Sequence, residues 1–145
     1  MHVHNYLYFC SKIHESMFNI RFKKYPFSCV LIAVIWYLSL LFNAPETPLD
    51  NVPLVDKWVH MVMYAGLVFV MWVDHVVRNK QKFTWAARIL MLLYAIALGG
   101  AMELVQAHLT TCRSGDWIDF EADAVGALIG KLVCVGLNWK FKTKN

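Results

Sequence analysis

Charged residues are scarce in this chain of 145 residues, where Asp, Glu, Lys and Arg together make up 17%. Apolar residues make up 59%, and the mean hydropathy is +0.45, which is unusual for a soluble domain of this length. The length allows one domain at most, and no internal repeat is visible. The composition therefore predicts a membrane protein, in which the bilayer covers much of the apolar surface.

Signatures of soluble enzymes are also missing from the sequence. It has no Gly-x-Ser-x-Gly, no Gly-rich phosphate loop and no dinucleotide fingerprint. Its four cysteines form no Cys-x-x-Cys pair, so no disulfide framework is predicted. Enzymatic activity is therefore a secondary hypothesis.

Four apolar segments, by contrast, have the length and character to cross a bilayer. They cover residues 26–42, 58–77, 85–105 and 117–139. Tryptophan, whose amphipathic indole favours the membrane interface, falls near the ends of these segments at positions 58, 72, 85, 117 and 139. The expected fold is all-α, a four-helix transmembrane bundle.

Basic residues gather on one side of the predicted spans. Most of the 14 precede the first span, join the second to the third, or follow the fourth, whereas the loops on the other side hold Lys57 and Arg113. The positive-inside rule then places both termini in the cytoplasm. The net charge of +4 is explained by this topology and by contact with anionic membrane lipids, so no nucleic-acid partner is expected.

Three parts are expected along the chain. Residues 1–25 place apolar residues at helical spacing and basic ones elsewhere, which predicts an amphipathic helix on the inner membrane surface. Residues 26–139 form the transmembrane domain, and residues 140–145 form a basic cytoplasmic tail. The first span lacks a good cleavage site and is expected to be retained. Asp74 and His75 are expected to decorate the cytoplasmic end of the second span.

Polar residues recur near the outer ends of three spans, at spacings that place them on one face of each helix. The predicted ligand-binding residues are Asp56, Lys57, His60 and Tyr64 on the second span, Glu103 and Gln106 on the third, and Arg113, Asp116, Asp119 and Asp123 leading into the fourth. An ionised group near the hydrocarbon costs about 2.5 to 3.5 kcal/mol, so these faces should meet around an outward-facing pocket. Acids outnumber bases there, so at least one carboxyl is expected to be protonated or to await a cation.

Small residues should let the helices approach closely. Ala122, Gly126 and Gly130 recur every fourth residue, and Gly99 and Gly100 lie one turn before Glu103. Such spacing favours close contact between helix backbones. Because the acids share this face of the fourth span, they should point into the helix contact.

Some of the polar residues also have a structural interpretation. Asp116 and Asp119 in a first helical turn complement the helix dipole, and Asp56 would cap its helix while Lys57 reaches the headgroups. For His60, a satisfied hydrogen bond and an acid–base role remain alternatives.

Metal binding would require Asp56, His60, Glu103 and Asp119 or Asp123 to converge. No compact ligand motif supports such a site, so neither a metal nor a cofactor is expected.

The order of the polar motifs resembles the VanZ family of small helical membrane proteins, named after a teicoplanin-resistance protein. Asp56-Lys57-x-x-His60-x-x-x-Tyr64, Glu103-x-x-Gln106, and Arg113 with Asp116, Asp119 and Asp123 ahead of Gly126 carry the resemblance, which covers residues 27–137. It implies a place in the bacterial cytoplasmic membrane and a link to glycopeptide tolerance, but no particular reaction. The family usually has Asn where this chain has Asp123, so an added acid is a departure.

Three functions are compatible with these patterns. The first is a non-enzymatic envelope protein that binds a cell-wall precursor, a lipid headgroup or a glycopeptide, with Arg113 and Lys57 contacting an anionic group. The alternative is a membrane hydrolase or transferase with His60 or Glu103 as general base. A third is a small proton-coupled carrier that uses Asp56, Glu103 and Asp123. Whether copies of the chain associate stays open.

Overall fold

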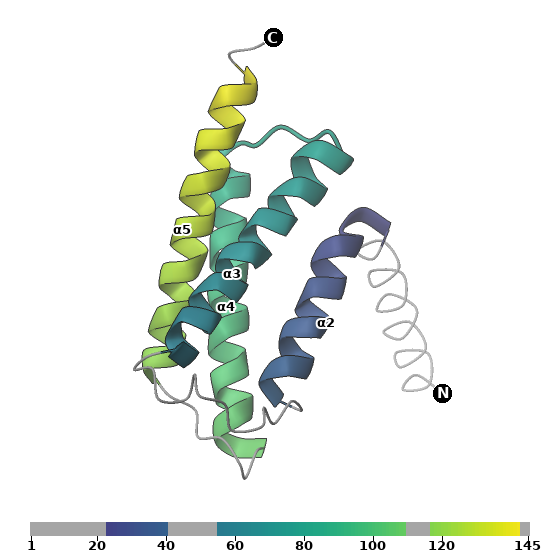
Figure 1. Cartoon of the computed structure of the whole chain (residues 1–145). Helices are drawn as coiled ribbons and strands as arrows, with labels where there is room; N and C mark the ends of the chain where they lie inside the picture. Colours follow the sequence, from purple (N-terminus) through teal and green to yellow (C-terminus); the bar gives the residue numbers. More distant parts are fainter. Residues whose placement is uncertain (1–22, 41–54, 110–116, 143–145) are drawn as a thin grey trace, which may run out of the picture.

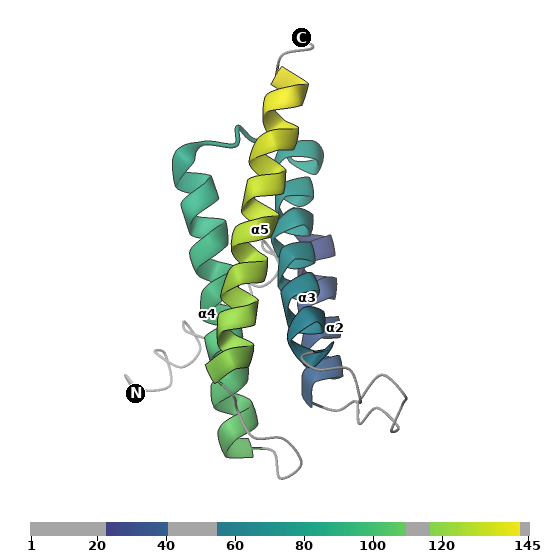
Figure 2. The same cartoon turned by 60° about the vertical axis from the view of Figure 1, so that its left-hand side comes forward.

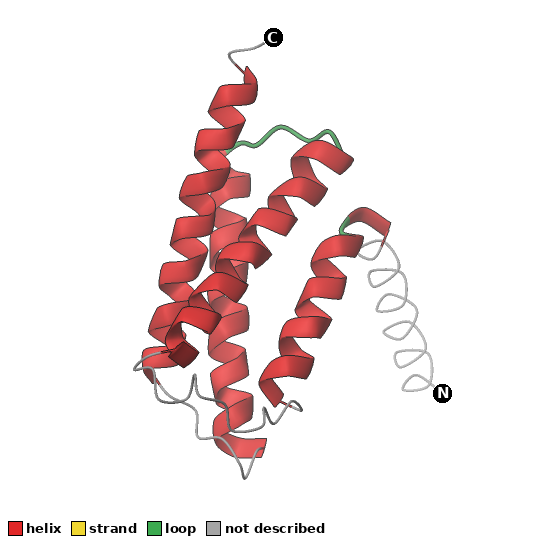
Figure 3. Cartoon of the chain, viewed as in Figure 1, coloured by secondary structure: helices red, strands yellow, loops and turns green. Residues whose placement is uncertain are grey.

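The computed structural model describes residues 23–40, 55–109 and 117–142, which form four helices (Figure 1). They are α2 (Pro26–Leu40), α3 (Val55–Trp72), which continues as the π-helix η2 (Val73–Arg78), α4 (Trp85–Leu109) and α5 (Trp117–Lys142). The described residues contain no strand (Figure 3), which confirms the all-α class. The amphipathic helix predicted within residues 1–25 falls almost wholly outside the described residues.

Each predicted span corresponds to one helix, although the ends differ. α4 and α5 continue past the predicted ends to Leu109 and Lys142, because good helix formers such as Gln, Ala and Lys extend a helix beyond its apolar run. α3 begins earlier than predicted, at Val55, and carries Asp56 in its first turn, where a carboxylate complements the helix dipole. Residues 41 and 42, predicted to end the first span, lie outside the described part.

The four helices run alternately up and down, so two sets of helix ends face opposite directions (Figure 1). One set comprises the start of α2, the end of η2, the start of α4 and the end of α5. We call it the basic end, after Lys24, Arg78, Lys80, Lys82, Arg88 and Lys140. We call the opposite set the acidic end, after Asp56, Glu103, Asp119 and Asp123.

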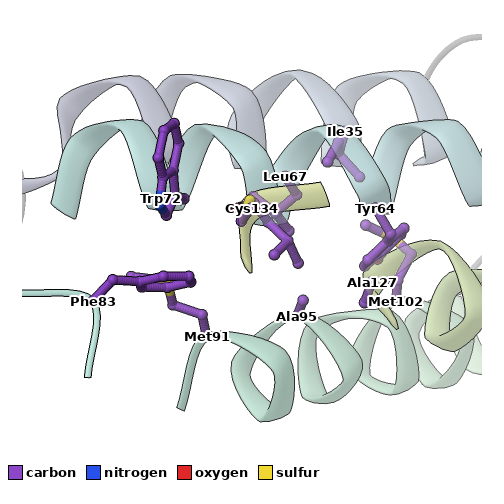
Figure 4. Close-up of a cluster of buried hydrophobic side chains, with 11 residues drawn as sticks. Ile35, Tyr64, Leu67, Trp72, Phe83, Met91, Ala95, Met102, Ala127 and Cys134 are labelled. Atoms are coloured by element: carbon purple, nitrogen blue, oxygen red, sulfur yellow. Dashed lines mark hydrogen bonds between the residues drawn. The ribbon is translucent and has the colours of Figure 1, made fainter. Parts of the chain in front are cut away.

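The closest association is between α3 and α5, with α4 packed on α5 and α2 beside α3 (Figure 1 and Figure 2). The core between them is apolar and includes Tyr64 and Leu67 of α3, Met102 of α4, and Ala127 and Cys134 of α5 (Figure 4). Within α2, Ile35 is the buried apolar residue. The bundle is therefore a tight group of three helices with α2 attached to its side.

Glycine allows α5 to touch the backbone of α3. A Cβ atom on Gly126 would lie 2.2 Å from the carbonyl oxygen of Met61, and one on Gly130 would lie 2.6 Å from the carbonyl oxygen of Ala65. Both distances are shorter than any real contact, and a backbone carbonyl cannot rotate away. These two positions, one helical turn apart, set the separation of the two helices.

Two helices have the length and apolar composition to cross a membrane: α3 with η2 over Val55–Arg78, and α4 over Trp85–His108. α2 is apolar but has 15 residues. α5 has 26 residues, with acids near its start and lysines later. Two of the four predicted spans thus meet both criteria.

Tryptophans mark several helix ends. Trp58, Trp85, Trp117 and Trp139 are each at least 60% exposed. Trp72 differs, since it is 3% exposed and packs in the core. It was expected near a membrane interface, but it lies one turn after Val68 on the buried face of α3.

Candidate functional site

A buried histidine–carboxylate pair joins α3 to α5 at the acidic end. His60 Nδ1 lies 3.0 Å from Asp123 Oδ1, and the side chains are 4% and 0% exposed. His60 comes one turn after Asp56 on α3, and Asp123 follows Asp119 by one turn on α5, so helical spacing directs both residues into the helix contact. The contact orients the imidazole ring by fixing one of its nitrogen atoms.

The second carboxylate oxygen of Asp123 faces α4. Oδ2 is buried, and no described residue donates a hydrogen bond to it. It fits there because position 99 is glycine: a Cβ atom on Gly99 would lie 2.8 Å from Oδ2. A buried carboxylate oxygen without a donor is costly, which distinguishes Asp123 from a residue that serves packing alone.

Glu103 brings a second carboxylate to this pair. It lies on α4 one turn after Gly99, and it is 9% exposed. His60, Glu103 and Asp123 each offer one ligand atom, and these atoms all lie within 4.8 Å of one another. Three side chains from three helices therefore converge, which we call the His60–Glu103–Asp123 cluster.

Two further acids flank the cluster. Asp56, His60 and Asp119 form a second group whose possible ligand atoms also lie within 4.8 Å of one another. Asp119 forms an ion pair with Lys57. Asp56 and Asp119 each lie in the first turn of their helix, so they also complement the helix dipoles, as the structural interpretation expects.

The other predicted binding residues do not join this cluster. Tyr64 is 1% exposed and belongs to the apolar core, one turn from His60. Gln106 is buried, and its Nε2 donates a hydrogen bond of 3.1 Å to the backbone oxygen of Ser39, which ties α4 to α2. Arg113 and Asp116 lie outside the described residues.

The small residues predicted to aid packing lie in or beside the helix contacts. Gly126 and Gly130 touch α3, and Gly99 accommodates Asp123. Gly100 faces the Phe120 ring, which a Cβ atom there would approach to 3.4 Å, and Ala122 is 7% exposed.

Sequence reasoning missed a polar cluster at the basic end. Asp74 was expected to decorate a helix end, but it is fully buried, and its Oδ2 accepts hydrogen bonds from the Ser28 backbone N–H (2.9 Å) and hydroxyl (2.8 Å). Asp74 is drawn inward because Ser28 lies in the first turn of α2, where free N–H groups attract a carboxylate. An acid inside an apolar segment needs a polar partner, so the position of Asp74 in the sequence does indicate a buried contact of this kind.

A tyrosine–histidine pair lies beside Asp74. His75 Nε2 lies 3.3 Å from the backbone oxygen of Lys82, to which it can only donate, so in the neutral imidazole Nδ1 accepts from the Tyr25 hydroxyl at 2.9 Å. Burial and the nearby Asp74 carboxylate raise the pKa of Tyr25, because both disfavour the phenolate. The hydroxyl therefore keeps the proton that this hydrogen bond needs.

A cleft of about 520 Å³ opens between α2, the α3–η2 segment and α4. Its lining is mainly apolar and includes Ile32, Met71 and Leu90, with Tyr25 and His75 at the basic end. It does not reach the His60–Glu103–Asp123 cluster, which lies toward the other end of the bundle.

No family model, curated protein or solved structure matches the chain. The resemblance to the VanZ family therefore rests on the order and spacing of the polar residues.

Proposed function

We propose that the chain is a VanZ-like membrane protein of the bacterial envelope. Its His60–Glu103–Asp123 cluster would bind a cell-wall precursor, a lipid headgroup or a glycopeptide and thereby influence tolerance to teicoplanin-type drugs. The observation that carries this proposal is the convergence of three ionisable side chains, from three helices, in a buried position. Ionisable groups in such positions within membrane helices are costly and usually functional.

The surface of the bundle supports a place in the membrane. Large apolar side chains on every helix are more than half exposed, among them Val30, Val62, Leu90 and Leu132. A surface of this kind suits lipid better than water. The exposed tryptophans at both ends of the bundle are typical of membrane interfaces.

Charge supports the orientation. The basic end carries most of the described lysines and arginines, and Lys131 reaches toward it, with its Nζ 5.6 Å from the centroid of the Trp85 ring. With that end in the cytoplasm, the acidic end faces outward, where envelope components are found.

The cluster favours a positively charged partner. The sequence suggested that Lys57 contacts an anionic group, but Lys57 forms an ion pair with Asp119. The acids around His60 thus outnumber the lysine beside them, and they attract an amine or another cation more readily than a bare anion.

Drug susceptibility tests this proposal. Cells that express the wild-type chain should tolerate teicoplanin-type drugs better than cells without it, and Glu103→Gln and Asp123→Ala should lose most of that gain. Glu121→Gln is the matched control, because Glu121 is exposed on α5 between Asp119 and Asp123. Membrane levels of every variant are measured in parallel. Unchanged tolerance in the two cluster variants, at normal levels, would contradict a role for the cluster.

The His60–Asp123 pair favours membrane hydrolase or transferase activity as a second candidate. A carboxylate that holds an imidazole in one orientation is the arrangement that makes histidine an effective general base. Purified protein given lipid-linked envelope precursors would then release a product, and His60→Gln would abolish the release. Product formation that persists in His60→Gln would exclude this role.

A further inference from the structure

We propose that His60, Glu103 and Asp123 form a binding site for a divalent transition-metal cation of the Zn²⁺ or Mn²⁺ type. This inference deepens the proposed function, on which it rests for the membrane setting of the cluster. A bound ion would neutralise the negative charge that the two carboxylates bring to the site.

The geometry of the cluster suits a single ion. The three ligand atoms lie within 4.8 Å of one another, and His60 Nδ1 and Asp123 Oδ1 are 3.0 Å apart. Two donors about 2.1 Å from one tetrahedral ion lie about 3.4 Å apart, so the pair needs to open by only a few tenths of an ångström. Each ligand comes from a different helix, so the packed bundle holds the three in place.

The buried oxygen of Asp123 is an independent indication. Oδ2 is buried against α4 at Gly99, and no described residue donates a hydrogen bond to it. Asp123 itself is 0% exposed, so bulk solvent does not contact its carboxylate. A cation beside the carboxylate would compensate for its desolvation, which packing alone does not do.

The donor set selects the class of ion. One imidazole and two carboxylates are a mixed nitrogen and oxygen set, which suits Zn²⁺ and Mn²⁺. Ca²⁺ prefers six or more oxygen ligands, which the cluster does not offer. Two ionised carboxylates also balance the double charge of the ion when the imidazole is neutral.

Metal titration of the purified chain tests the site. Full-length protein without an affinity tag is stripped with a chelator in detergent and titrated with Zn²⁺ or Mn²⁺, by calorimetry and by elemental analysis. We expect near-stoichiometric binding, with affinity at least about tenfold weaker in Glu103→Gln and Asp123→Asn and unchanged in Glu121→Gln. His2 and His4 are present in every variant, so any binding by them is common to all.

Circular dichroism and thermal unfolding check that each variant folds. Asp123→Asn preserves the size of the side chain and can still hydrogen bond to His60, so it should fold; Zn²⁺ should raise the melting temperature of the wild type but not of this variant. Equal binding by wild type and both cluster variants, or no binding by the wild type, overturns the inference. If the wild type binds no ion but confers tolerance that needs Glu103, the metal site fails and the proposed function stands. If the wild type binds the ion but does not change tolerance, the metal site stands and the proposed function fails.

Discussion

At the scale of single residues, glycine decides how near α5 comes to α3. Gly126 and Gly130 face the carbonyl oxygens of Met61 and Ala65 with no room for a Cβ atom. The same contact brings His60 and Asp123 within hydrogen-bonding distance, since Asp123 lies three residues before Gly126 and so faces nearly the same direction. Packing and chemistry therefore depend on the same small side chains.

We expect Gly126→Ala to lower the free energy of unfolding by about 1 to 3 kcal/mol or more, because the added methyl group forces two backbones apart. Thermal unfolding in detergent measures the effect. Gly136→Ala is the matched control on the same helix: a Cβ atom there has nothing within 4 Å, so it should stabilise the helix by up to about 1 kcal/mol. Equal effects at the two positions would show that the close contact is unimportant.

Much of the residue-scale arrangement follows from helical spacing. Positions 56, 60 and 64, and positions 119, 123 and 126, predict which faces of α3 and α5 meet, because side chains three or four apart share a face. Spacing within a helix does not predict partners across helices. The Lys57–Asp119 pair, the Gln106–Ser39 bond and the burial of Asp74 all depend on which helix lies beside which.

At the scale of elements, α2 is held differently from the other helices. It contributes one buried apolar residue, Ile35, and its two polar attachments lie near its ends. Ser28 bonds to Asp74 at the basic end, and the Ser39 backbone oxygen accepts from Gln106 at the other. These polar contacts add to the packing of partly buried α2 side chains against the core, which is less extensive than the packing between α3 and α5.

Asp74→Ala should therefore loosen α2 selectively. The change leaves the Ser28 amide and hydroxyl without their carboxylate, which costs about 1 to 3 kcal/mol for buried groups. Hydrogen exchange in detergent should become faster in α2 and remain unchanged in α5. Val77→Ala, at an exposed site on the same π-helix, serves as the control. Exchange in α2 that matches the wild type would mean that Asp74 does not hold this helix.

At the scale of the whole molecule, charge separates along the bundle. Helix count, apolar composition and the distribution of lysine and arginine predict an even-numbered bundle with both termini on one side. In the structure, the start of α2 and the end of α5 lie at the same end (Figure 1). The helix ends were less predictable, because hydropathy detects apolar runs and not the capping or packing that ends a helix.

The predicted orientation can be measured with fusions to the C-terminus. If the basic end lies in the cytoplasm, as the positive-inside rule predicts, green fluorescent protein fused after Asn145 should fluoresce and alkaline phosphatase at the same point should be inactive. Fusions in the loop between residues 109 and 117 should behave in the opposite way. The reverse pattern would turn the His60–Glu103–Asp123 cluster toward the cytoplasm and remove its access to external drugs.

The two attachments of α2 also fix its axial register. Hydrogen bonds are directional and therefore specify the axial position of a helix more sharply than apolar packing does, and Ser28 and Ser39 must meet Asp74 and Gln106 at the same time. One residue inserted between them would shift one contact by about 1.5 Å and rotate it by about 100° relative to the other. The number of residues between Ser28 and Ser39 is therefore constrained. This stretch should tolerate substitutions far better than insertions or deletions.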